Sequence, residues 1–337
     1  MSPALVHQLY NLTPLAVLGA IAWIVSRAAR TPLWGEALRR LRRNPTARVA
    51  AAVAGLYVLV AVADSVGWYD TASQERRTVV DAVFERPRER TYSAPLADRT
   101  FGEPRPAPLI GRHLMGTDGV GADVLYRALK GVRTAFQIGG TTLCIVTPLA
   151  LALGLISGYH GRWRDDAIMY AVTVLSSIPG ILLQIAMVLV LGKGVPQICI
   201  ALGVTRWVGL CRLVRGEAIK HRDREYVRAA KALGVGDTAI LARHILPNLL
   251  PVVIISTTLS FSSLVLAEAI LSYLGVGVPD GTGSWGNMID AARDELARDP
   301  VIWWNLGAAT VAITGLALPM NLLGDALRDA VDPRLRS

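Results

Sequence analysis

Long apolar stretches alternate with shorter polar ones along this chain, and the pattern predicts helices that cross a membrane. A spanning helix needs about 20 mostly apolar residues. Seven candidate stretches lie at residues 12–29, 48–66, 135–157, 167–191, 195–214, 247–275 and 301–323. Arg206 and Arg212 interrupt the fifth, so we expect that span to be short or tilted. The pattern therefore predicts an all-α membrane protein.

The first stretch, 12–29, has two interpretations. No Lys or Arg precedes it, whereas Arg27 and Arg30 lie at its end. A secretory signal peptide has the reverse order of charge and apolar residues. We therefore expect a retained extra N-terminal transmembrane helix that begins outside, and a cleaved signal is the alternative.

Charges between the apolar stretches predict the orientation, because cytoplasmic loops carry an excess of Lys and Arg. Such an excess occurs at residues 27–48 and 212–243, and the loop 158–166 carries Arg162 and Arg164, whereas 276–300 is richer in Asp and Glu. The long segment 67–134 has nearly balanced charge, and its place in the alternation puts it outside. The C-terminus is then expected in the cytoplasm.

These assignments divide the chain into four parts. We expect an extra helix and basic cytoplasmic linker (1–47), a first core helix with a long external segment (48–134), a helical core (135–325) with a cytoplasmic loop (215–247), and a cytoplasmic tail (326–337). Within the external segment we expect a short helix at 121–131 that begins near Asp118 or Gly119.

Composition supports the membrane class, since 52% of residues are apolar and only 18% are charged. Soluble domains carry about 25% charged residues. The net charge of +9 lies in short stretches between apolar runs, so we expect no nucleic-acid partner. Three cysteines without a CxxC pair and five scattered histidines predict neither a disulfide framework nor a metal site.

Catalytic motifs give no support to an enzyme. The chain contains no GxSxG, no HExxH and no GxxxxGK[ST] phosphate-binding loop. Serine pairs at 176–177 and 262–263 lie in predicted spans without His or Asp at comparable depth. We expect no catalytic residue here, and a membrane-embedded enzyme is kept as the alternative class.

The stretch 215–251 predicts a helix, a glycine turn and a second helix on the cytoplasmic side. A helix is expected over 217–233, ended by Gly234 and Gly236, because glycine readily adopts the left-handed cap conformation. Asp237 is expected to cap a short helix through Ala242. Pro247 suits the first turn of the next span.

Such a segment has two interpretations. A generic basic loop is usually a solvated connection whose charges have no partner. Alternatively, small residues permit close approach of another protein, and flanking Arg and Lys residues pair with an acidic groove on it.

The residues favour docking, because 226–247 resembles the EAA loop of ABC importer permeases. That motif reads E-A-A, three residues, G, nine residues, I, one residue, L-P. The residues that match it are Ala229, Ala230, Gly234, Leu246 and Pro247. Arg228 replaces the consensus Glu and His244 replaces the Ile, and the nearby Glu225 is the substitute candidate.

Further segments are similar to the dipeptide, oligopeptide and nickel branch of that family. They are HLMGTDGVGADVLYRALKGVR (113–133), GLISGYHGRWRDD (154–166), LVRGE (213–217), AEAILSYLGVGVPDGTGSWGNMI (267–289) and NLLGDALRDAVDPR (321–334). The resemblance covers most of the chain from about residue 113. It implies a six-helix permease core in the inner (cytoplasmic) membrane of a prokaryote, with the N-terminal helix as an addition.

The resemblance also implies a function and partners. The chain would form half of a pathway for peptides or a similar small solute, beside a homologous second permease subunit. Two cytoplasmic ATPases would dock on the loops and hydrolyse ATP, so no cofactor is expected on this chain. An external substrate-binding protein would deliver cargo, and nickel is the alternative cargo.

Glu268 is an acidic residue inside the apolar stretch 249–276, so its role needs an explanation. A carboxylate near the centre of a span costs roughly 2.5–3.5 kcal/mol on insertion scales. One interpretation is a gate or pathway residue. The other is a residue near the outer end of its span that hydrogen-bonds a neighbour.

Overall fold

The computed structural model describes residue 19 and residues 32–69 and 76–331. Its described part is mostly helical, as the sequence predicts. The helices are α2 (Pro32–Arg43), α3 (Pro45–Ser65), α4 (Val79–Phe84), α5 (Val124–His160), α6 (Arg162–Ser177), α7 (Gly180–Leu191), α8 (Val195–Arg222), α9 (Glu225–Ala232), α10 (Asp237–Ile240), α11 (Leu246–Tyr273), α12 (Trp285–Leu296) and α13 (Trp304–Val331). A π-helical turn (Leu241–Ile245) joins α10 to α11, and β1 (Gly67–Tyr69) pairs antiparallel with β2 (Arg76–Thr78).

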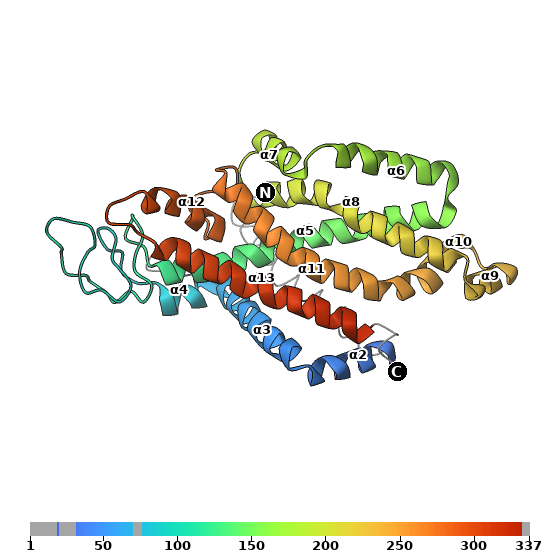
Figure 1. Cartoon of the computed structure of the whole chain (residues 1–337), viewed down its shortest axis with the longest axis horizontal. Helices are drawn as coiled ribbons and strands as arrows, with labels where there is room; N and C mark the ends of the chain where they lie inside the picture. The colour runs from blue at the N-terminus through green and yellow to red at the C-terminus, as the bar shows by residue number, and fades with distance from the viewer. Residues whose placement is uncertain (1–18, 20–31, 70–75, 332–337) are drawn as a thin grey trace.

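Among the described residues, five helices are long and apolar enough to cross a membrane. They comprise α3, α5, α8, the helix that runs from α10 through α11, and α13. Figure 1 shows these helices as an elongated bundle, with α9 and α10 at one end and the irregular segment that precedes α5 at the other. The expected helix at 12–29 lies outside the described residues.

The span expected at 167–191 is not one continuous helix. The structure has two helices there, α6 and α7, which are bent by 86° at their junction and count as one span only if taken together. Pro179 caps α7, and Ile178 before it is extended, with φ −96° and ψ 129°. A residue before proline is driven out of the helical region, which explains the break.

The expected short helix at 121–131 is the first part of a longer one. α5 begins after Asp123, whose side chain accepts a hydrogen bond from the Tyr126 amide. Asp118 instead accepts from the amides of Val120 and Ala122, which closes the turn that precedes the helix. The helix is therefore continuous from the external segment through the membrane span.

Among the described helices, α5 and α8 have the most extensive contact. A Cβ added to Gly154 would lie 2.8 Å from the Cys211 carbonyl oxygen, and one added to Gly158 would lie 2.6 Å from that of Arg215. Only glycine allows two backbones to approach this closely. Arg215 also donates two hydrogen bonds of 2.6 Å to Asp165, so α6 is held against the same pair of helices.

A cap formed by residues 76–123 covers one end of the bundle. The Lys130 ammonium of α5 lies 2.7 Å from Asp64 and 2.6 Å from Asp81, which ties α3, α4 and α5 together. Burial raises the pKa of Asp81, but hydrogen bonds from Lys130, the Thr78 amide and Tyr126 outweigh it and hold that pKa below its ordinary value.

Candidate coupling surface

A glycine turn follows α9, as the sequence predicts. Gly234 has φ +78°, in the left-handed region that favours glycine. Its amide donates to the Lys231 carbonyl at 3.0 Å, and the Val235 amide donates to the Ala230 carbonyl at 3.1 Å. These two bonds form a Schellman motif, which satisfies the last carbonyls of α9. The turn is therefore a defined structure and not a loose loop.

The helix that precedes this turn is shorter than expected. α8 ends at Arg222 and α9 begins at Glu225, so the helix expected over 217–233 is broken at Asp223 and Arg224. Asp237 is also not the cap of the next helix, because Gly236 occupies that position and Asp237 is the first helical residue. The break allows α9 to leave the direction of α8 at the end of the bundle (Figure 1).

One face of α9 packs on the bundle and the other is exposed. Val227 and Ala230 are buried in an apolar cluster that includes residues of α5, α8 and α11. Glu225 and Ala229 are exposed, as is Arg228 where the EAA motif has Glu. Leu233 completes this face, and 85% of its side chain is exposed. We call Glu225, Arg228, Ala229, Leu233 and Gly234 the candidate coupling surface.

Tyr159, at the end of α5, braces both halves of the segment. Its hydroxyl donates a hydrogen bond of 2.6 Å to the carboxylate of Asp237 on α10. The Lys231 ammonium of α9 lies 4.6 Å from the centre of its ring, within the range of a cation–π contact. The tyrosine side chain is itself buried. The glycine turn is therefore fixed to the bundle on either side.

The second half of the segment runs directly into α11. The Leu246 amide bonds to the Leu241 carbonyl five residues earlier, which makes the joint a π-helical turn. Pro247 lies in the first turn of α11, as expected, where its missing N–H is best tolerated. Leu246 is half-buried and Pro247 is exposed. Of the residues matching the motif, Ala230 faces the core, and Leu246 and Pro247 lie apart from the exposed face of α9.

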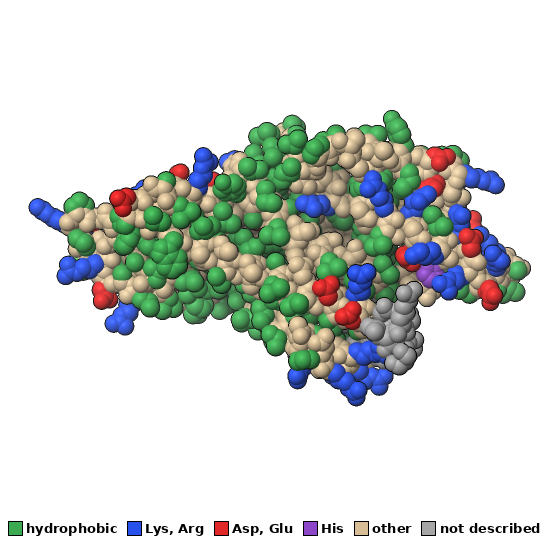
Figure 2. Space-filling view, in the orientation of Figure 1, with side chains coloured by type: hydrophobic (Ala, Val, Ile, Leu, Met, Phe, Trp, Pro, Cys, Tyr) green, Lys and Arg blue, Asp and Glu red, His purple; other side chains and the backbone are tan. Residues whose placement is uncertain are grey.

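Basic side chains gather near this end of the molecule. Figure 2 shows Lys and Arg groups around α9 and α10, interspersed with fewer acidic ones. His221 Nδ1 lies 2.6 Å from the Tyr226 hydroxyl, which links the end of α8 to α9. Burial raises the pKa of Tyr226 above its ordinary value, and nearby Arg224 opposes that effect.

Two residues of this site were missed from the sequence. Tyr159 lies in GLISGYHGRW, 78 positions before Asp237, and only the tertiary fold brings them together. Leu233 could have been noticed from the sequence, because it is a large apolar residue directly before a cap glycine in a segment rich in charged residues.

Glu268 lies near the other end of α11 and is fully enclosed, with 2% of its surface exposed. Its Oε1 accepts hydrogen bonds from the hydroxyls of Ser272 at 2.8 Å and Ser284 at 2.7 Å. Ser284 also caps α12 by accepting from the Gly286 amide. The carboxylate therefore joins the last turn of α11 to the first turn of α12.

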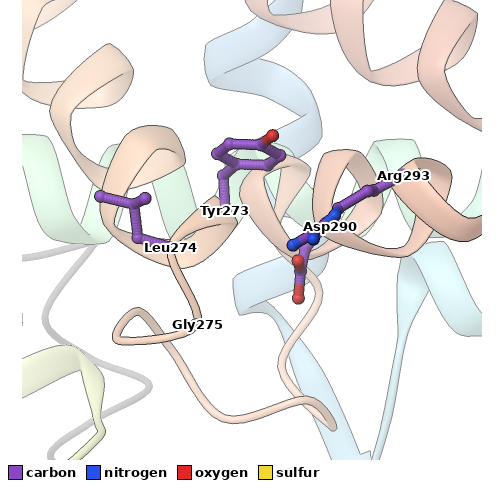
Figure 3. Close-up of a pocket in the computed structure, with 5 residues that line it drawn as sticks. All are labelled: Tyr273, Leu274, Gly275, Asp290 and Arg293. Atoms are coloured by element: carbon purple, nitrogen blue, oxygen red, sulfur yellow. The ribbon is translucent and has the colours of Figure 1, made fainter.

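A shallow cavity of about 520 Å³ lies beside this joint. Figure 3 shows the lining residues: Tyr273 ends α11, Leu274 and Gly275 follow it, and Asp290 and Arg293 lie on the neighbouring α12. Glu268 does not line it. Across the residues that the structure describes, no three His, Cys, Asp or Glu side chains are grouped to hold a metal ion.

Comparison with known proteins identifies the family. Residues 150–337 match the model of binding-protein-dependent transport system inner membrane components, and residues 32–80 match the N-terminal transmembrane domain of oligopeptide transport permease C. The oligopeptide transport system permease protein OppC of Bacillus subtilis is 31% identical over 90% of each chain. The glutathione transport system permease protein GsiD of Pectobacterium atrosepticum is 31% identical over 96% of this chain and 98% of its own. The dipeptide transport system permease protein DppC of Alkalihalophilus pseudofirmus is 30% identical over 90% of this chain. This chain therefore belongs to the family of binding-protein-dependent transport system inner membrane components, the permease subunits of ABC importers.

Proposed function

We propose that this permease forms half of a translocation pathway for peptides or a similar small solute. The printed names of its relatives support this cargo class, since they are permeases for oligopeptides, dipeptides and glutathione. Matches that span 90% or more of this chain support a shared architecture along the whole pathway. The absence of a catalytic motif from the sequence agrees with a transport role.

The observation that carries the proposal is the exposed Leu233 on a turn that is braced from both sides. An isolated leucine at the tip of a projecting segment gains free energy only when a partner buries it. The brace through Tyr159 and Asp237 allows a push on this tip to reach α5 and α8. We therefore assign Glu225, Ala229, Gly234 and Leu233 to contact with the ATPase, and Ala230, Leu246 and Pro247 to holding the segment in place.

The partners follow from this assignment. A homologous second permease completes the pathway, two ATPase subunits dock on the two coupling surfaces, and an external binding protein delivers cargo. ATP is hydrolysed on the ATPases, because this chain has no phosphate-binding loop. No cofactor on this chain is needed.

We place the coupling surface and the end of α13 on the cytoplasmic side of the inner membrane. The basic stretch 212–243 supports this orientation through the positive-inside rule. The cap of residues 76–123 then faces the external binding protein, since it lies at the opposite end of the bundle (Figure 1). In this arrangement Glu268 holds the outer ends of α11 and α12 together beside the external gate.

The experiment compares Leu233→Ser with Leu114→Ser, a control for ATPase association that lies in the cap at the opposite end of the bundle and is 60% exposed. Each variant is co-expressed with the second permease and the ATPases, purified in mild detergent, and reconstituted for uptake of a labelled tripeptide. We expect Leu233→Ser to lose the ATPase subunits and uptake while keeping the second permease. Retention of the ATPases by Leu233→Ser would refute the coupling surface, and a wild-type complex that imports no peptide would refute the cargo class.

A further inference from the structure

One arginine lies in the middle of a membrane span. Arg206 is eleven residues after Val195, the first residue of α8. At 1.5 Å per residue it lies about 16 Å from that end of the helix. The hydrocarbon core is about 30 Å thick, so this charge lies near the midplane. Figure 2 shows isolated basic side chains over the middle of this part of the bundle as well as at its end.

The other charged donors of α8 have polar partners within the chain. Arg212 donates to the Ser176 hydroxyl at 2.7 Å, and Arg215 donates to both oxygens of Asp165. Arg222 donates to the Gly158 carbonyl, and Lys220 pairs with Glu217. These contacts fix the basic side chains of the lower half of the helix to α5 and α6 or along α8 itself.

Arg206 differs from all of them. Its side chain is exposed on the surface of this subunit, and within the described ranges no hydrogen bond or ion pair reaches its guanidinium. An ionised group at this depth is costly against lipid, and such groups almost always face a water-filled cavity or a charged partner. The guanidinium therefore faces a water-filled space or a charged group outside this chain.

Two glycines follow Arg206 along α8. Gly209 is exposed and Gly216 is half-buried on the same side of α8, and a Cβ added to either would meet no atom within 4 Å. At the level of Arg206, Gln184 of α7 donates to the Thr205 hydroxyl at 2.9 Å, and its own Oε1 has no partner among the described residues. This polar layer lies beside an exposed glycine and the exposed Arg212, and such a surface suits the passage of a solute better than a packed apolar contact.

We propose that Arg206 faces the translocation pathway and binds a carboxylate of the cargo as it crosses the membrane. The cargo class rests on the proposed function, since a free peptide carries a terminal carboxylate. A guanidinium presents paired donors that match both oxygens of a carboxylate, and the bond is charge-assisted. A lysine keeps the charge but loses the paired geometry.

The first test places Arg206 without any cargo. Arg206→Cys is made in a chain whose Cys144, Cys199 and Cys211 are replaced by serine, and the complete importer is treated with a small, water-soluble anionic thiol reagent. Val190→Cys on α7, which is 86% exposed, is the control for a lipid-facing position. We expect labelling at Arg206→Cys and none at Val190→Cys. Protection of Arg206→Cys only when the second permease is bound would overturn the proposal in favour of an ion pair between the subunits.

The second test measures selectivity. Uptake of a tripeptide and of its C-terminal amide is compared for wild type, Arg206→Lys and Arg206→Gln, each as a ratio to wild type so that the preference of the binding protein cancels. We expect Arg206→Gln to reduce uptake of the free acid about tenfold and that of the amide little, with Arg206→Lys between. Equal losses for both peptides would overturn the carboxylate contact. If wild type imports neither peptide while Arg206→Cys is labelled, the cargo class fails, the carboxylate contact fails with it, and the pathway position of Arg206 stands.

Discussion

The hydroxyl of Tyr159 donates a hydrogen bond of 2.6 Å to the carboxylate of Asp237, across 78 positions of sequence. One residue ends a membrane-spanning helix and the other begins the short helix after the glycine turn. The contact therefore joins the candidate coupling surface to the interior of the bundle.

Tyr159→Phe removes this hydrogen bond and keeps the ring against which Lys231 lies. A hydrogen bond to a charged group contributes about 1.5–3 kcal/mol. We expect the variant to assemble with the ATPases but to transport fewer solute molecules per ATP hydrolysed. Without this hydrogen bond, α9 and α10 can move relative to α5 when the ATPase moves, so less of that movement reaches the bundle. Uptake and ATP hydrolysis measured on the same proteoliposomes give this ratio.

Asp237→Asn and the double variant complete that comparison. If the two groups act through each other, the double variant loses no more than either single one. Losses that simply add would show that the two residues contribute independently.

Gly234→Val should abolish uptake and ATPase association while membrane insertion stays normal. A non-glycine residue in the left-handed region costs about 1–2 kcal/mol, and a β-branched one is the worst case. A Cβ at Gly234 would meet no atom within 4 Å, so the loss would arise from the turn and the docked partner and not from a clash within the chain.

Gly234→Asn is the matched control, because asparagine tolerates the left-handed conformation. We expect it to keep a substantial part of the uptake. Normal uptake by Gly234→Val at normal expression would contradict the docking role of the turn.

Glu268→Gln should retain function, whereas Glu268→Leu should not. Glutamine keeps an acceptor for the hydroxyls of Ser272 and Ser284, and leucine leaves both without one, which costs about 1–3 kcal/mol for each buried group. Limited proteolysis of the loop between α11 and α12, together with uptake, checks this. A glutamine variant that is intact but inactive would show that the charge itself acts at the gate.

Glu295→Gln should raise the thermal stability of the protein near neutral pH. Glu295 is buried in α12, one of its oxygens has no hydrogen-bond partner among the residues that the structure describes, and burial raises the pKa of its carboxyl group. A carboxyl whose pKa is higher in the folded protein favours folding below its unfolded value of about 4.3, and this contribution is lost as pH rises through the folded value. The gain from Gln should therefore disappear at about pH 4, and a gain that is the same at both pH values would contradict the burial argument.

The sequence predicted the helical class and most spans because apolar composition and length alone determine which helices can cross a membrane. It also located the glycine turn at Gly234, since that signal is local. It did not separate α6 from α7, because Pro179 lies within a long stretch that is mostly apolar. The contact between Tyr159 and Asp237 could not be predicted from the sequence either. It forms only when α5 packs against α8, and no local sequence pattern indicates it.

The close approach of α5 and α8 at Gly154 and Gly158 has a mechanical consequence. Helices whose backbones touch cannot slide past each other. The bidentate hydrogen bonds from Arg215 to Asp165 also attach α6 to α8. The two helices therefore behave as one stiff lever about 40 Å long, at 1.5 Å for each of the residues in α8. A movement of the ATPase against Leu233 would tilt both helices together. Arg206 lies part-way along α8, so it would move in the same direction by a smaller distance.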